Sequence, residues 1–132
     1  MSTAKQKILI VDDEPDILEL IEYNLKKEGY QVFLASNGQE GISVAKKVHP
    51  DLIILDIMMP KMDGIEACRL MRAIPEFKNT FMVFLTARSE EYSEIAGFNV
   101  GADDYIAKPI KPRALVSRIN AIFRRNASGE EV

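Results

Sequence analysis

Short aliphatic runs alternate with longer amphipathic stretches along almost the whole chain. Short runs that are apolar on both sides are typical of strands buried within a parallel sheet. The pattern therefore predicts five strands, over residues 7–11, 31–35, 51–56, 81–86 and, more weakly, 104–107.

The stretches between these runs have the spacing of amphipathic helices. Pro15 is a favourable first-turn residue, and Gly29 ends the first expected helix. The other helices are expected over residues 38–48, 64–74, 89–98 and 112–125. Five strand–helix repeats predict an α/β fold, a flavodoxin-like doubly wound parallel sheet of five strands in order 2-1-3-4-5 with five helices.

Composition places the chain among globular proteins of one domain. Its 132 residues are one domain by length, and its net charge of -3 argues against a general nucleic-acid-binding surface. A lone cysteine, Cys68, excludes an internal disulfide, and no apolar run is long enough for a membrane span or a signal peptide. We therefore expect a cytoplasmic protein without membrane contact, with its domain over residues 1–125 and a linker start or artificial tail over 126–132.

Polar residues stand where the predicted strands end. Asp12 and Asp13 follow the first strand, and Asp56 ends the third. Thr86 ends the fourth strand and Lys108 follows the fifth. In a doubly wound sheet, ligands bind beyond the carboxyl ends of the strands, where the strand order reverses. We therefore expect all five side chains to project into one crevice.

Three carboxylates in one crevice repel one another unless a cation or a proton relieves the repulsion. Such a set of hard oxygen ligands suits Mg²⁺. Lys108 would neutralise a phosphoryl oxygen, and Thr86 would donate a hydrogen bond to it. Asp56 is the best candidate nucleophile, because it lies alone on the middle strand and a carboxylate can form an aspartyl phosphate.

The ordered set of these motifs resembles the receiver domain of bacterial two-component response regulators. It comprises the acidic pair 12–13, Asp56 with the stretch 58–64 (MMPKMDG), Thr86-Ala87 and Lys108-Pro109, and the resemblance covers about residues 6–125. The stretches YNLKKEGY, DIMMPKMDG, GADDYIAKP and FRR are similar to the OmpR/PhoB group. Receivers of that group are usually followed by a winged-helix DNA-binding domain, which this sequence does not contain.

The resemblance implies a role for each acidic residue. Asp56 is the phosphoacceptor, and a sensor histidine kinase is the donor. Asp13, Asp56 and the backbone carbonyl of Met58 bind Mg²⁺ directly, whereas Asp12 acts mainly through bound water. The protein is then a switch rather than an enzyme, because it catalyses only its own phosphorylation and slow dephosphorylation.

The resemblance also implies a switch and an output surface. Thr86 and Tyr105 form the switch pair, and the Lys108–Pro109 peptide is cis. Output runs through the face built on residues 89–98, 104–107 and 112–125.

Active receivers of the OmpR/PhoB group pair symmetrically through that face. Asp104 and Arg118 match one ion pair expected across the dimer axis, and Asp103 could make another with the arginines at 124–125. Glu94 and Ala114 replace a base and an acid of the usual pattern. The resemblance therefore implies a phosphorylation-dependent homodimer that lacks one bridge.

The phosphoryl group is expected to hydrolyse slowly. The attacking water must pass the side chains two residues beyond Asp56 and two beyond Thr86, which are Met58 and Arg88. Neither is an acid or an amide that would orient the water, and both are bulky.

Other interpretations of the same residues remain open on the sequence alone. A haloacid-dehalogenase-like phosphatase commonly has a second acid two residues after its nucleophile, where this chain has Met58. A nucleotide or flavin module needs a glycine-rich first turn, where this chain has DDEPD. A degenerate receiver would lack motif residues that are all present here. Singly, Asp13 could cap a helix, Thr86 could make a local bond and Tyr105 could be a half-buried aromatic.

Overall fold

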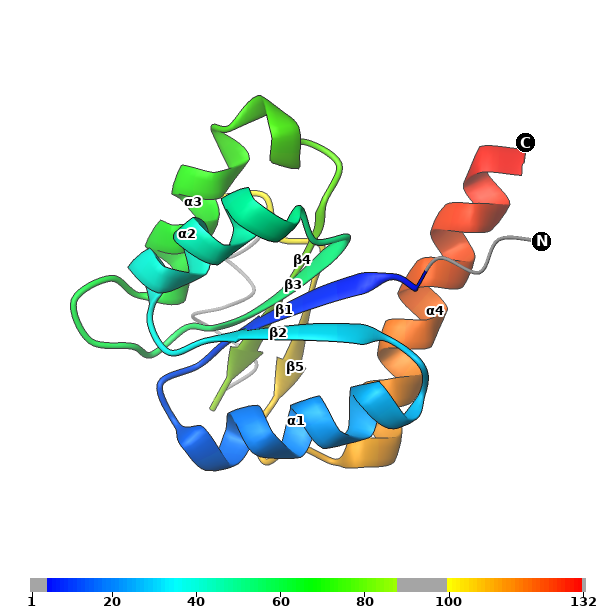
Figure 1. The fold of residues 1–132 in the computed structure, drawn as a ribbon, viewed down its shortest axis with the longest axis horizontal. Helices are drawn as coiled ribbons and strands as arrows, with labels where there is room; N and C mark the ends of the chain where they lie inside the picture. Colours follow the sequence, from blue (N-terminus) through cyan, green and yellow to red (C-terminus); the bar gives the residue numbers. More distant parts are fainter. Residues whose placement is uncertain (1–4, 88–99, 132) are drawn as a thin grey trace.

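The protein folds around one parallel sheet of five strands in the order β2-β1-β3-β4-β5 (Figure 1). The structure is a computed structural model that describes residues 5–87 and 100–131. The strands are β1 (Lys7–Val11), β2 (Gln31–Ala35), β3 (Leu52–Asp56), β4 (Phe81–Thr86) and β5 (Asp104–Ala107). The predicted flavodoxin-like fold and its strand order are confirmed.

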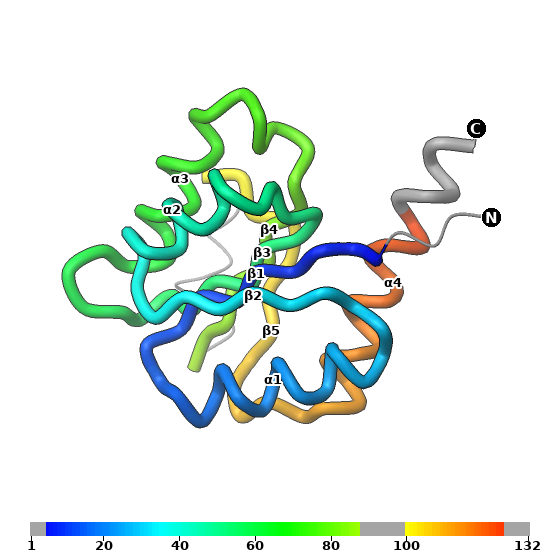
Figure 2. Tube along the Cα trace, in the orientation of Figure 1, coloured from blue at the N-terminus to red at the C-terminus, as the bar shows by residue number. Residues whose placement is uncertain are grey.

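Helices cover both faces of this sheet. They are α1 (Pro15–Lys27), α2 (Gly38–Val48), α3 (Gly64–Arg72) and α4 (Pro112–Glu131), with a 3-10 turn, η1, at Pro75–Phe77. Helices α1 and α4 lie on one face and α2 and α3 on the other (Figures 1 and 2). The fifth predicted helix, over residues 89–98, lies outside the described residues.

Alternating side chains of the strands fill two separate cores. On β1, Ile8 and Ile10 pack in the cluster that includes residues of α1 and α4, whereas Leu9 and Val11 pack in the cluster with residues of α2 and α3. All four are fully buried. Because side chains alternate across a strand, covering both faces requires apolar residues at consecutive positions. This requirement explains the aliphatic runs in the sequence.

Some element boundaries differ from those predicted. Strand β3 begins at Leu52, one residue later than predicted, and the carboxylate of the exposed Asp51 before it accepts a hydrogen bond from the backbone N–H of Lys7 at 2.8 Å. Helix α3 ends at Arg72 rather than at residue 74. The residue before a proline is disfavoured in the α conformation, and Ile74 before Pro75 is indeed extended.

The last helix is longer than predicted. Helix α4 continues to Glu131, past the expected end at Arg125 and through the stretch predicted as a linker or tail. The polar composition of that stretch predicted a tail, yet it contains no proline, and a single glycine weakens a helix by only about 1 kcal/mol.

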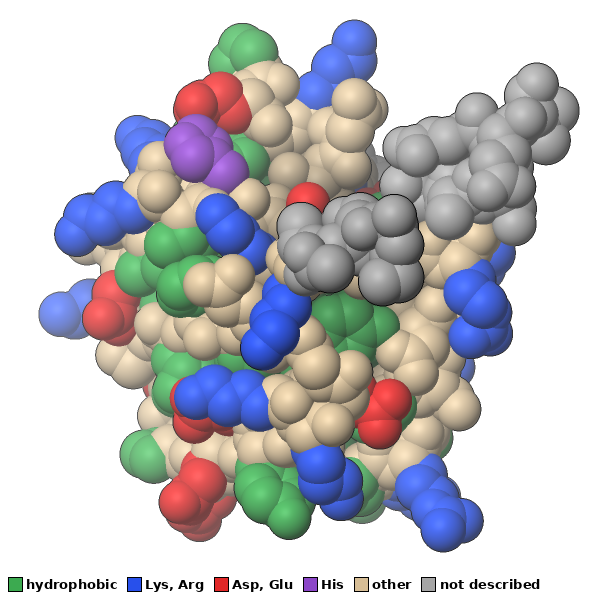
Figure 3. All heavy atoms as spheres, turned by 45° about the vertical axis from the view of Figure 1, so that its right-hand side comes forward, with side chains coloured by type: hydrophobic (Ala, Val, Ile, Leu, Met, Phe, Trp, Pro, Cys, Tyr) green, Lys and Arg blue, Asp and Glu red, His purple; other side chains and the backbone are tan. Residues whose placement is uncertain are grey.

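No helix among the described residues has the length and apolar character needed to cross a bilayer. The surface carries charges of both signs. On the face shown in Figure 3, lysine and arginine side chains are spread among acidic, polar and apolar ones rather than gathered in one patch.

Candidate functional site

The sheet register brings the acidic residues together. Strands β1 and β3 are neighbours, and Val11 pairs with Leu55, so Asp12 and Asp56 follow at matching positions. Carboxylate oxygens of Asp12, Asp13 and Asp56 all lie within 4.8 Å of one another. The structure therefore places the three predicted carboxylates in one cluster beyond the carboxyl ends of the strands.

Asp12 is fully buried at the centre of this cluster. Its Oδ1 accepts a hydrogen bond from the backbone N–H of Glu14 at 2.8 Å. Its Oδ2 is buried and has no hydrogen-bond partner in the described part of the chain. The N-cap of α1 is Glu14, whose side chain makes no capping bond, so the interpretation of Asp13 as a helix cap is wrong.

One ammonium group faces three carboxylates. Lys108 Nζ donates a hydrogen bond to Glu14 Oε1 at 2.9 Å and lies 3.3 Å from both Asp12 Oδ2 and Asp56 Oδ1. At Asp12 this distance is within ion-pair range without the geometry of a hydrogen bond, in agreement with the unsatisfied Oδ2. The Lys108–Pro109 peptide is cis, as the resemblance implied.

The crowding shifts the acid–base equilibria of the site. Burial and the nearby charge of Asp12 raise the pKa of Asp56 to about 6, although Lys108 opposes the shift. Burial also raises the pKa of Asp12. Burial alone would lower the pKa of Lys108, but its hydrogen bond to Glu14 and the charges of Asp56 and Asp12 raise it overall. The site therefore holds more negative charge than one lysine can neutralise.

The loop after β3 is held close to the nucleophile candidate. Gly64, the first residue of α3, donates its N–H to Ile57 O at 3.0 Å. A Cβ at Gly64 would lie 2.3 Å from the backbone oxygen of Asp56, so only glycine fits. Asp63 caps α3 by accepting a hydrogen bond on its Oδ1 from the N–H of Glu66 at 2.8 Å.

The remaining predicted site residues differ in how deeply they are buried. Thr86 is buried at the end of β4, and its backbone oxygen accepts the N–H of Lys108 at 2.7 Å. Tyr105 is half-buried on β5. Met58, in contrast, is 68% exposed. Arg88 lies outside the described residues.

The donor set fits a hard divalent cation. Oxygens of the three carboxylates lie within 4.8 Å of one another, close enough to bind one ion together. One of these oxygens, Asp12 Oδ2, is buried and lacks a hydrogen bond among the described residues. The pKa values of Asp12 and Asp56 are raised. Each of these features is a cost to the fold that a cation among the oxygens would reduce.

Sequence reasoning missed Glu14 as a member of the site. Its carboxylate is the only one that accepts a hydrogen bond of ordinary length from Lys108 Nζ among the described residues. The available signal was its place directly after the acidic pair. The lysine that it holds comes from the far end of the chain, so its role could not be inferred from local spacing.

Three expected interface residues, Asp103, Asp104 and Arg118, have ion-pair partners within the chain. Arg118 Nη1 lies 3.1 Å from Asp104 Oδ2. Arg72 Nη2 lies 2.9 Å from Asp103 Oδ2. A pairing across a dimer axis would therefore have to replace or share these contacts.

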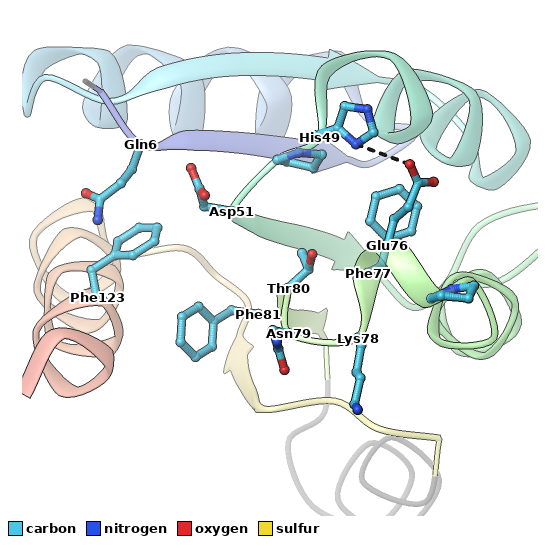
Figure 4. Close-up of a pocket in the computed structure, with 12 residues that line it drawn as sticks. Gln6, His49, Asp51, Glu76, Phe77, Lys78, Asn79, Thr80, Phe81 and Phe123 are labelled. Carbon is cyan, nitrogen blue, oxygen red and sulfur yellow. Dashed lines mark ion pairs between the residues drawn. The ribbon is translucent and has the colours of Figure 1, made fainter. Parts of the chain in front are cut away.

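A cavity of about 400 Å³ lies at the other end of the strands, where β1, β3 and β4 begin (Figure 4). Phe77, Phe81 and Phe123 line it, and His49 Nδ1 lies 3.8 Å from Glu76 Oε2 at its rim. No carboxylate cluster of the metal-binding kind lies there among the described residues, so the chemistry of the acidic cluster decides the candidate site rather than the size of the cavity.

The fold and the acidic cluster are those of a receiver domain, and the similarity of this chain to known proteins agrees. Residues 8–120 match the family described as "Response regulator receiver domain", and the chain belongs to this family. This membership favours the receiver over the phosphatase and the nucleotide-binding module. The family is one of signalling proteins rather than metabolic enzymes.

Individual relatives refine this assignment. The chain is 47% identical, over 92% of its length, to the alkaline phosphatase synthesis transcriptional regulatory protein PhoP of Bacillus subtilis, and spans about half of that relative. A putative response regulator from Chloroflexus aurantiacus is 38% identical with a TM-score of 0.85, over 90% of this chain and 98% of that one. The chemotaxis protein CheY4 of Vibrio cholerae is 32% identical with a TM-score of 0.86, over 89% and 98%.

Proposed function

We propose that this receiver domain accepts a phosphoryl group on Asp56 from a sensor histidine kinase and thereby switches its output surface. The observation that carries the proposal is the cluster of Asp12, Asp13 and Asp56, with Lys108 Nζ 3.3 Å from an oxygen of Asp56. A buried carboxylate with a pKa near 6 is largely ionised at neutral pH, so Asp56 is available as a nucleophile.

In the proposed reaction, a carboxylate oxygen of Asp56 attacks the phosphorus of the donor. A phosphorus–oxygen bond forms as the bond between phosphorus and the donor's histidine nitrogen breaks, and that nitrogen takes up a proton from solvent. Lys108 neutralises charge on the transferred oxygens, and Thr86 donates a hydrogen bond to one of them. Lys108 is already held beside Asp56, so little movement of the lysine is needed.

Mg²⁺ is the proposed cofactor. Asp13, Asp56 and the backbone carbonyl of Met58 would hold it directly, and Asp12 through water. When bound, the cation supplies positive charge that offsets the carboxylates and admits an anionic donor. The buried Asp12 Oδ2, which lacks a hydrogen bond within the described part of the chain, supports a role for a further group at this position.

The proposed switch couples this site to the surface that carries β5 and α4. Thr86 moves toward the phosphoryl group, and Tyr105 rotates inward into the space that it leaves. Phosphorylation then favours a homodimer with Asp104 and Arg118 at the interface. DNA would be contacted only through an output domain outside this sequence, in line with the B. subtilis relative, a transcriptional regulatory protein about twice as long as this chain.

Phosphorylation by a small phosphodonor tests the proposal. Acetyl phosphate with Mg²⁺ should add one phosphoryl group to the wild-type protein, as seen by intact-mass spectrometry. Asp56→Asn or removal of Mg²⁺ by a chelator should abolish the addition, whereas Asp51→Asn, an exposed acid at the other edge of the sheet, should not. A phosphoryl group that persists on the Asp56→Asn variant would show that another residue is the acceptor.

A further inference from the structure

Met58 is unusual because it contributes little to the core. With Tyr23, at 63%, it is one of two large apolar side chains that are exposed among the described residues, and its own exposed fraction is 68%. Exposure of a thioether side chain forgoes the hydrophobic stabilisation that burial would give. The fold therefore does not require a methionine at this position.

Met58 lies in a tight turn directly after the proposed phosphoacceptor. Ile57 donates its N–H to Leu85 O at 3.1 Å, so the pairing of β3 with β4 continues one residue beyond Asp56. The side chain of Ile57 is fully buried in the core. Met59 donates its N–H to Ile57 O at 3.1 Å, so the chain turns at Met58, and this exposed side chain follows the buried Asp56 by two residues.

The other methionines in the described part of the chain are better protected. Met71 and Met82 are fully buried and Met59 is 7% exposed. Met62 is half-buried and packs against Gly38. Oxidation of methionine follows access of the oxidant to the sulfur, so Met58 should react before the others.

We propose that Met58 is an oxidation site through which peroxides shorten the lifetime of the phosphorylated state. A peroxide transfers one oxygen atom to the thioether sulfur: the sulfur–oxygen bond forms as the peroxide O–O bond breaks. Sulfur is oxidised by two electrons, and the peroxide is reduced to water or an alcohol. The inference deepens the proposed function and rests on phosphorylation of Asp56.

The chemical effect follows from the change in the side chain. A thioether is a weak acceptor, whereas a sulfoxide oxygen is a strong one. Beside Asp56, such an acceptor would take a hydrogen bond from the water that attacks the phosphoryl group and so orient it. One added hydrogen bond in the hydrolytic transition state corresponds to roughly a fivefold faster loss of the phosphoryl group.

The test compares phosphoryl lifetimes before and after brief treatment with hydrogen peroxide. Peptide mapping should place the first added oxygen on Met58. After phosphorylation with acetyl phosphate and Mg²⁺ and removal of the donor, intact mass should show roughly fivefold faster decay in the treated protein. Met58→Leu should decay at one rate with or without peroxide, and Met58→Gln should decay faster without treatment. Met62→Leu should respond like the wild type.

The outcomes separate this inference from the proposed function. Untreated protein that takes up no phosphoryl group would overturn both. Normal phosphorylation with equal lifetimes before and after oxidation would overturn the role of Met58 alone. The same holds if oxidation falls first on another methionine, or if Met58→Leu responds to peroxide like the wild type.

Discussion

The two ends of the parallel strands differ in how completely their charged groups are hydrogen-bonded. At the edge where β4 and β5 begin, one cation, Arg72, is almost fully satisfied. It donates to the backbone oxygens of Gly101, Phe77 and Thr80 at 2.9, 2.7 and 2.7 Å, and to Asp103 Oδ2 at 2.9 Å. At the carboxyl edge, Lys108 is shared by three carboxylates.

This difference separates stability from function. The Arg72 network joins α3, the turn before β4 and the turn before β5 with nearly every donor used, so it stabilises the fold. The acidic cluster instead leaves Asp12 Oδ2 without a hydrogen bond from any described residue and raises the pKa of Asp56 to about 6. Unrelieved charge of this kind is a feature of sites that bind or react.

Loss of Arg72 should have the largest effect on stability. Arg72→Ala removes the hydrogen bonds of this side chain to Asp103 and to four backbone oxygens, and we expect the free energy of unfolding to fall by about 3 kcal/mol. Arg69→Ala is the matched control on the same helix. Its exposed pair with Glu66 should contribute much less, because solvent screens the two charges. Urea denaturation of both variants measures the difference, and equal losses would contradict a stabilising role for the Arg72 network.

Closing the gap beside Asp56 should weaken both fold and reaction. The added methyl group of Gly64→Ala would meet the backbone oxygen of Asp56, and overpacking of this kind costs about 2 kcal/mol. Phosphorylation by acetyl phosphate should slow as well, because the acceptor is displaced. Gly38→Ala is the control, since its Cβ would meet only the flexible side chain of Met62. A Gly64→Ala variant with normal stability would show that the backbone yields easily.

Neutralising Asp56, the proposed phosphoacceptor, should stabilise the metal-free protein. The folded state binds the proton of Asp56 more tightly than the unfolded chain does, because the pKa rises from 3.8 to about 6. Wild-type stability from this group therefore falls as the pH rises from about 4 to about 6 and stays lower above that. Asp56→Asn should be more stable by about 2 kcal/mol near pH 7 and by much less near pH 4.

Denaturation of the wild type and Asp56→Asn across this pH range, with a chelator present, checks the prediction. A stability advantage of Asp56→Asn that is constant from about pH 4 to about pH 7 would contradict the raised pKa.

The smallest effect concerns the surface pair of Arg118 and Asp104. Both groups are partly exposed, so Arg118→Ala should change monomer stability by less than about 1 kcal/mol. It should weaken the dimer of beryllofluoride-treated protein, and added salt should weaken the wild-type dimer in the same direction. Light scattering measures both. If the dimer forms equally well without the Arg118 side chain, another surface is used.

The sequence predicted those site residues that directly follow a recognisable strand. Asp12 and Asp56 were found because each follows an aliphatic run, and the register of β1 with β3 brings such ends together. Glu14 and Arg72 were not found, because their partners come from distant loops that show no periodic pattern. The end of α4 at Glu131 was missed because polar composition alone does not stop a helix.

The acidic cluster is an electrostatic cost to the fold, and Mg²⁺ should relieve it. The decisive measurement is the unfolding midpoint of the wild type and of Asp56→Asn with and without Mg²⁺, near neutral pH and without a phosphodonor. Binding to the folded state alone raises stability by mass action, so Mg²⁺ should raise the midpoint of the wild type. The midpoint of Asp56→Asn should change much less, because one ligand and most of the repulsion are gone. Equal shifts in the two proteins, or no shift in the wild type, would contradict a cation-binding role for the cluster.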